Sequence, residues 1–114
     1  MIIKNRLTEM RRLLASGWSR TFYWTDDKDR ATPREVATHH CIVGAASKAA
    51  CEPTGFAVGT SKGAQALFSA IQPHLPDPYR RYEYALRACI CFNDEHDQKG
   101  VLNVLDKAIA AQDT

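Results

Sequence analysis

The sequence has no apolar run long enough to cross a membrane and no apolar leader. Its longest uncharged apolar run, 41–47, is far shorter than the roughly 20 residues of a membrane-spanning helix. Lys4, Arg6 and Glu9 also interrupt the start of the chain, where a signal peptide needs an unbroken apolar stretch. We therefore expect a cytoplasmic protein that makes no contact with a membrane.

The sequence also lacks the cysteine spacing of a zinc site. Cys89 and Cys91 are two positions apart, so on a helix they point to different faces. His39, His40 and Cys41 are adjacent, and they could not converge on one ion without ligands from elsewhere. We predict no metal and no cofactor, and we interpret the cysteines as small buried residues with reduced thiols.

Neither basic nor acidic residues are in large excess. The chain of 114 residues has 15 basic and 13 acidic side chains and a net charge of +2, which neither predicts nor excludes nucleic acid as a partner. Hydrophobic residues make up 45% and charged residues 25%, as in ordinary globular proteins. A chain of this length forms one core, so we expect a single helical domain spanning 1–114.

What the sequence does contain is helical periodicity. It predicts a mainly α fold, in which a compact bundle of about five helices surrounds a central helix at 33–50. The other helices are expected at 2–16, 61–71, 78–92 and 98–111. Gly17 follows the first of them, and we expect it to end that helix in a left-handed cap.

The central helix has the clearest start signal. Thr32 can cap it, Pro33 can occupy its first position, and Glu35 follows the cap by three residues, as in a capping box. Gly44 lies among small apolar residues, and its expected use is to let another backbone approach closely. A short β-hairpin formed by 18–25 and 55–60 is an alternative for the segments between the helices.

Two surfaces are candidates for binding a partner, because interfaces are enriched in Tyr, Trp and Arg. The first is the aromatic segment with Trp18, Arg20 and Trp24. The second is the outer face of the helix at 78–92, with Tyr79, Arg80, Arg81, Tyr84 and Arg87. Each surface also has a simpler interpretation, since the aromatic side chains can cover the core and the basic ones can form an ordinary solvated face.

A third candidate is an anion site formed by Ser61, Lys62 and Gly63. The free N–H groups at the start of a helix can hold an anion, and Lys62 would lie beside it. The segment is not a phosphate loop, because its lysine precedes the glycine and no parallel-strand pattern stands in front of it. A small-molecule or nucleotide-binding site near 59–63 is therefore one alternative function.

A small enzyme is the other alternative, with Cys41 as the nucleophile and His96 as its partner. His40 is the neighbour of Cys41, but adjacent side chains on a helix point about a quarter-turn apart, so His40 cannot readily serve Cys41. His96 would have to come from a different element. Because no catalytic motif occurs here in its required context, we predict no catalytic residues.

Three short motifs together resemble a family. They are Gly17-Trp18, then Cys41 followed by Gly44-Ala45, and finally Phe92-Asn93-Asp94. The chain is similar in this order of signals to a functionally uncharacterised small domain family of bacteria and their phages. The resemblance implies a compact, mainly helical, standalone cytoplasmic protein with no established activity, and it supplies no catalytic residues. The sequence departs from the pattern at His40, where an aromatic residue often precedes the cysteine, and at Gly100.

From the missing catalytic chemistry and the resemblance, we expect a non-catalytic interaction protein. It would be phage-related and would bind a host protein or nucleoprotein complex, as an inhibitor or modulator of host defence or regulation. Nucleic acid and a second copy of the chain remain open as partners. The small-residue face of the central helix suits self-association as well as packing within one chain.

Overall fold

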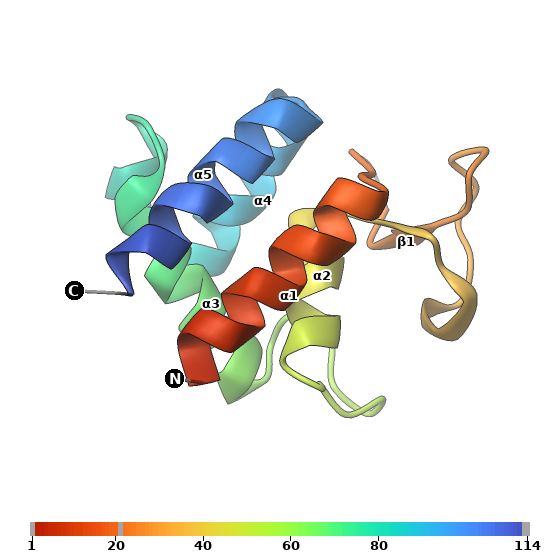
Figure 1. Cartoon of the computed structure of the whole chain (residues 1–114). Helices are drawn as coiled ribbons and strands as arrows, with labels where there is room; N and C mark the ends of the chain where they lie inside the picture. The colour runs from red at the N-terminus through yellow and green to blue at the C-terminus, as the bar shows by residue number, and fades with distance from the viewer. Residues whose placement is uncertain (1, 21, 113–114) are drawn as a thin grey trace.

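The computed structural model describes residues 2–20 and 22–112 and confirms the predicted mainly α fold. Figure 1 shows the helices gathered around a central core, with the small β-sheet on one side of the bundle. Within the described part there are five α-helices: α1 (Ile2–Ser16), α2 (Ile42–Ala49), α3 (Lys62–Ile71), α4 (Ala85–Glu95) and α5 (Gln98–Ala111). Strands β1 (Trp24–Thr25) and β2 (His39–His40) form an antiparallel pair. The described residues also form the 3-10 turns η1 (Arg34–Val36), η2 (Gln72–His74) and η3 (Tyr79–Arg81). Among the described residues no helix is long and apolar enough to cross a membrane.

Helix α1 forms one side of the core. It packs against α2 and lies side by side with α5 (Figure 1). Its stripe residues Leu7, Met10 and Leu14 are completely buried, as the 3.6-residue period of the sequence predicts. At the rim, the Arg11 Nε donates to the Asp106 Oδ1 at 2.6 Å. The apolar stripe therefore determines how α1 packs. The exposed ion pair at the edge contributes little, since such pairs are worth at most about 1 kcal/mol.

Helix α2 is the central helix, but it is much shorter than the predicted range 33–50. Seven of its eight residues are buried, as the small apolar composition of this segment indicates. The predicted start at Thr32 and Pro33 is wrong, because the Thr32 backbone N–H donates to the Trp24 carbonyl at 3.2 Å. The helix begins after Cys41, whose Sγ accepts a hydrogen bond from the Gly44 backbone N–H at 3.5 Å. Residues 33–41 consequently form a 3-10 turn and a strand.

The small sheet has a different partner from the one that the sequence suggested. Trp24 lies opposite His40 and Thr25 opposite His39, so the hairpin partner is 39–40 and the expectation of 55–60 is wrong. The segment 55–60 turns instead around the buried carboxylate of Glu52, which accepts hydrogen bonds from the Gly59 and Ser61 backbone N–H groups at 2.8 Å each. Those N–H groups are therefore not available to a strand.

Helix α4 starts later than predicted and extends further. The predicted helix at 78–92 is interrupted, with η3 first and α4 only from Ala85 to Glu95. The Gln72 Nε2 donates to the Tyr79 carbonyl at 3.2 Å and to the Tyr82 carbonyl at 2.8 Å. A continuous helix would need these carbonyls for its own hydrogen bonds, so the amide of Gln72 favours a break between the two parts.

Gly17 follows α1, as predicted, but it is not a left-handed cap. Of the six glycines, only Gly59 has a positive φ, at 83°. A Cβ on Gly17 would lie 2.4 Å from the Thr38 carbonyl oxygen, which is far inside van der Waals contact. The glycine is therefore required because the strand that leads into α2 passes close to the end of α1, and not because of its backbone angle.

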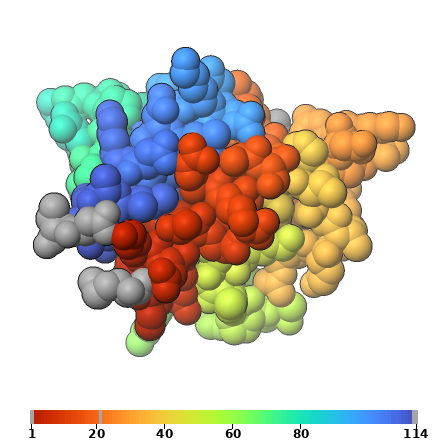
Figure 2. All heavy atoms as spheres, viewed as in Figure 1, coloured from red at the N-terminus to blue at the C-terminus, as the bar shows by residue number. Residues whose placement is uncertain are grey.

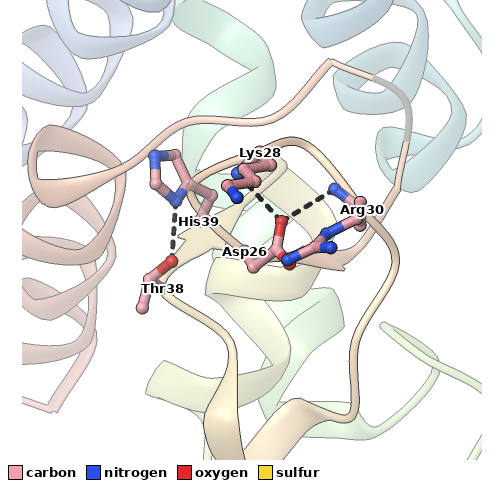
Figure 3. A network of polar contacts seen from close by, with 5 residues as sticks. All are labelled: Asp26, Lys28, Arg30, Thr38 and His39. Atoms are coloured by element: carbon pink, nitrogen blue, oxygen red, sulfur yellow. Dashed lines mark hydrogen bonds and ion pairs between the residues drawn. The ribbon is translucent and has the colours of Figure 1, made fainter.

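The turn after β1 projects from the body of the protein, as the orange lobe in Figure 2 shows. Figure 3 shows how the Asp26 carboxylate organises it: Oδ1 accepts from the backbone N–H groups of Lys28 at 2.9 Å and Arg30 at 3.0 Å. The backbone hydrogen bond from Arg30 is the main reason that the pKa of Asp26 lies below its usual range. At the base of the lobe the Thr38 hydroxyl bonds to the His39 Nδ1 at 2.8 Å (Figure 3).

Candidate functional site

Asn93 is buried, with 1% of its surface exposed, and it connects three segments that are distant in sequence. Its Oδ1 accepts hydrogen bonds from the Trp18 indole N–H at 2.9 Å and from the Ile42 backbone N–H at 3.1 Å. Its Nδ2 donates to the carbonyls of Ser19 at 3.2 Å and Arg20 at 3.3 Å. All four hydrogen-bonding positions of the amide are thus used, and the segment after α1 is tied to the start of α2 and to α4.

Gly44 places the same segment against α2. A Cβ on Gly44 would lie 2.2 Å from the Tyr23 carbonyl oxygen and 3.1 Å from the Trp24 ring. The prediction that this glycine lets another backbone approach is therefore confirmed. On the other side of the segment, the Arg20 Nη1 donates to the Asp94 carbonyl at 2.9 Å. The three motifs that carry the family resemblance meet here around Asn93.

A hollow of about 140 Å³ lies where these segments meet. Ile42, Val43 and Ile90 form its apolar part, and Cys41 and Asn93 also line it. Arg20, Tyr23 and Asp94 complete the lining. The hollow is small for a drug-sized ligand, since such sites usually measure about 300 to 1,000 Å³, but it has room for one side chain of a partner.

Arg20 and Tyr23 line the hollow, and further exposed aromatic and basic side chains occur on the same segment and on α4. Phe22 is 45% exposed and Tyr23 43% exposed, although large apolar side chains usually turn inward. On α4, Arg87 is exposed and lies on the same stripe as Ile90 and Asp94, because residues three or four apart share a helix face. Tyr84 at the start of α4 is 68% exposed. We refer to Arg20, Phe22, Tyr23, Tyr84 and Arg87 as the aromatic-arginine face.

Comparison of the sequence with known protein families finds a match over most of the chain. The sequence model of DUF6197, a family of unknown function, matches residues 3–111. The chain belongs to this family. No curated protein and no solved structure matches the chain.

In this DUF6197 protein the residues of the first predicted surface have different environments. Trp18 is half-buried against the core and bonded to Asn93, which fits the interpretation of the aromatic residues as core cover. Trp24 is also half-buried, and its ring meets the His40 ring edge-on at 6.0 Å. Arg20 is exposed, with its guanidinium 5.1 Å from the centre of the Trp18 ring. Of these three, only Arg20 is exposed.

The second predicted surface of the DUF6197 chain is likewise divided. Tyr79 is buried, with 7% exposed, and its hydroxyl donates to Glu95, which raises the pKa of Tyr79 to about 12. Arg80 and Arg81 are exposed, and both pair with the Asp77 carboxylate at 3.2 and 3.4 Å. Tyr84 and Arg87 are exposed on the aromatic-arginine face. The sequence indicated Phe22 and Tyr23 only as members of the aromatic segment 18–24 and did not indicate Ile90, because nothing local shows which side chains line a hollow.

The predicted anion site at Ser61, Lys62 and Gly63 faces a carboxylate from within the chain. Glu52 is 4% exposed, and it accepts the Ser61 N–H and the Ser47 hydroxyl at 2.8 Å each. Burial opposes the ionisation of Glu52, but the hydrogen bonds from Ser61, Gly59 and Ser47 outweigh it and keep its pKa below the usual range. The Ser61 hydroxyl in turn accepts the Ala64 N–H at 3.2 Å. An internal anion therefore already satisfies the donors before α3.

Cys41 and His96 line different hollows of the DUF6197 chain. Burial raises the pKa of the Cys41 thiol to about 11, so the thiol stays protonated at neutral pH and is a poor nucleophile. The His96 ring stacks on Phe92 with the ring centres 4.1 Å apart. In the described parts of the chain, no three His, Cys, Asp or Glu side chains are grouped as metal ligands.

His40 is expected to make the protein sensitive to acid. It is 2% exposed, and neither ring nitrogen has a hydrogen-bond partner within residues 2–20 and 22–112. Burial, followed by the nearby charges of Lys48, His39 and Arg12, lowers the pKa of His40 to about 4. In the unfolded chain a histidine binds this proton near pH 6.5. The free energy of unfolding is therefore unaffected by His40 above about pH 6.5, and it decreases by about 2 to 3 kcal/mol as the pH falls toward 4.

This expectation can be measured by urea unfolding at intervals between pH 7.5 and 4.5. We expect His40→Phe to flatten the pH profile, because a phenyl ring has no proton to gain and can still meet Trp24 edge-on. His74→Gln in η2 is the control, because His74 is not among the groups that lower the pKa of His40, and this variant should leave the slope as in the wild type. Equal slopes in the wild type and His40→Phe would show that the acid sensitivity has another origin.

Proposed function

We propose that this DUF6197 chain is a non-catalytic interaction protein that binds another protein through the aromatic-arginine face. The observation that carries the proposal is the hollow of about 140 Å³ lined by Arg20, Tyr23 and the α4 residue Ile90, with Tyr84 and Arg87 exposed on the same helix or at its start. Tyr and Arg are the residues that most often dominate binding energy, and they do so around pockets that exclude water. The apolar part of the hollow suits one apolar anchor side chain of the partner.

The wider biological setting is inferred from the resemblance. The proposal places the protein in the cytoplasm of a bacterium, as a product of the bacterium or of its phage. Its partner there would be a host protein or nucleoprotein complex, and it would act as an inhibitor or modulator of host defence or regulation. The protonated Cys41 thiol supports a binding role over the alternative of a small enzyme.

The test compares capture of host proteins by matched variants. Arg20→Glu with Arg87→Glu reverses two charges on the aromatic-arginine face, and Lys28→Glu with Lys99→Glu reverses two exposed charges elsewhere. Each tagged protein is purified gently from a bacterial lysate and examined by native mass spectrometry. We expect the wild type and the lysine variant to retain the same stoichiometric protein, and the arginine variant to bind it at least about tenfold more weakly.

Three results would count against the proposal. One is a partner that all the variants retain equally, which would place the interface elsewhere. The second is nucleic acid as the only bound species. The third is a homo-oligomer with no other component, which would assign the face to self-association.

A further inference from the structure

A second and larger hollow lies away from the aromatic-arginine face. It measures about 670 Å³ and is formed by the segment 73–77, by η3, by the end of α4 and by one side of α5. Its apolar floor includes Leu75, Phe92 and Val104. The size falls within the range of about 300 to 1,000 Å³ that is usual for small-molecule sites.

The groups around this hollow carry an excess of positive charge. Arg80 and Lys107 line it together with one carboxylate, that of Asp77. Asp77 also pairs with Arg81, at 3.4 Å, beside its contact with Arg80 at 3.2 Å. Lys107 is exposed and has no ion-pair partner within residues 2–20 and 22–112. One carboxylate is therefore shared by two arginines, and the lysine charge is not neutralised.

The side chains of His96 and Asn103 also line the hollow and can form hydrogen bonds to a ligand. His96 is fixed, because its Nδ1 lies 3.1 Å from the Phe92 carbonyl and its ring stacks on the Phe92 ring. A carbonyl can only accept, so Nδ1 carries a proton and Nε2 remains for a ligand. Asn103 and Lys107 are four residues apart on α5 and both line the hollow, as expected for neighbours on one helix face.

We propose that this hollow binds a small molecule that carries a phosphate group. Arg80 and Lys107 hold the phosphate oxygens, because a doubly charged anion neutralises both cations and can accept several hydrogen bonds. The floor of Leu75, Phe92 and Val104 covers an apolar part of the same ligand. This site is distinct from the Ser61, Lys62 and Gly63 segment, where the Ser61 N–H is already bound to Glu52.

The test is a titration of the ¹⁵N-labelled protein by NMR, at constant ionic strength set with chloride. The probes are inorganic phosphate and phenyl phosphate. We expect saturable shifts in the amide signals of Gly100, Asn103 and Lys107, and binding of phenyl phosphate at least about fivefold tighter, because its ring can cover the apolar floor. Arg80→Gln with Lys107→Gln should weaken both probes at least about tenfold.

The matched control is Lys99→Gln, which removes another exposed lysine from the same helix without touching the hollow. It should bind both probes as the wild type does. Unsaturable shifts spread over all the basic residues, or equal affinities for all the variants, would overturn the proposal. Shifts confined to 59–64 would also overturn it, and would return the anion to the start of α3. None of these outcomes depends on whether the aromatic-arginine face binds a protein.

Discussion

Replacing Asn93 by leucine is expected to lower the free energy of unfolding by about 4 kcal/mol, because four buried or part-buried groups lose their partner and an unpaired buried group costs about 1 to 3 kcal/mol. These groups are the Trp18 indole N–H, the Ile42 N–H and the carbonyls of Ser19 and Arg20. Leucine has the same branched side-chain skeleton as asparagine, with methyl groups in place of the amide oxygen and nitrogen, so the loss measures hydrogen bonding and not a cavity. A domain of this size has about 5 to 15 kcal/mol of stability in total. Urea unfolding followed by tryptophan fluorescence measures the change.

Asn5→Ala is the control for this experiment. Asn5 is exposed on α1, and alanine is the better helix former, so this variant should match or slightly exceed the wild type. If Asn93→Leu unfolds within about 1 kcal/mol of the wild type, the segment after α1 does not depend on Asn93. An unchanged Trp18 indole N–H signal in the NMR spectrum of Asn93→Leu would lead to the same conclusion.

The sequence predicts those elements whose packing follows from their own periodicity. The helices at 2–16 and 98–111 have the predicted bounds, since a continuous apolar stripe is a local property of the chain. Helix α3, predicted at 61–71, begins one residue later, at Lys62, with Ser61 as its cap. Such elements need no information from distant segments.

The errors come from backbone groups whose partners are distant in sequence. Thr32 and Pro33 form a good local helix start, yet the Thr32 N–H bonds to Trp24 and the His40 N–H bonds to Gly17. A propensity that amounts to a fraction of a kcal/mol per residue cannot compete with a set of such hydrogen bonds. Tertiary contacts therefore decide the structure of 32–40, and no local pattern records them.

The same reason limits what could be predicted of the candidate site. Asn93 stands in a polar segment that resembles a turn, but its partners lie 51 to 75 residues away. The sequence correctly indicated that Gly44 serves a close backbone approach, without indicating that the backbone belongs to Tyr23. Single residues of the site could be found by their type, whereas the hollow between them depends on the fold.

Gly44→Ala is expected to be the most disruptive substitution of small size. It should lower the free energy of unfolding by about 3 kcal/mol, even after the helix-propensity gain of about 1 kcal/mol. The new methyl group would lie 2.2 Å from the Tyr23 carbonyl oxygen, and a backbone atom cannot turn aside as a flexible side chain can. The strand with Trp24 must then move away from α2. We expect a lower urea midpoint, altered Trp24 fluorescence and shifted amide signals at 22–25. Because Tyr23 borders the hollow, partner binding should weaken as well.

Two other glycines provide controls for the same change. A Cβ on Gly55 would have no neighbour within 4 Å, and one on Gly63 would meet the flexible Arg6 side chain at 3.0 Å and the Ala50 Cβ at 3.1 Å. Gly55→Ala should therefore match or exceed the wild type, and Gly63→Ala should stay within about 1 kcal/mol because α3 gains a better helix former. If Gly44→Ala behaves like these two, α2 and the Tyr23 backbone are further apart in solution than the structure has them. A loss of stability that occurs with Gly44→Ala and not with the controls would show that one close backbone contact positions Tyr23, and with it part of the aromatic-arginine face.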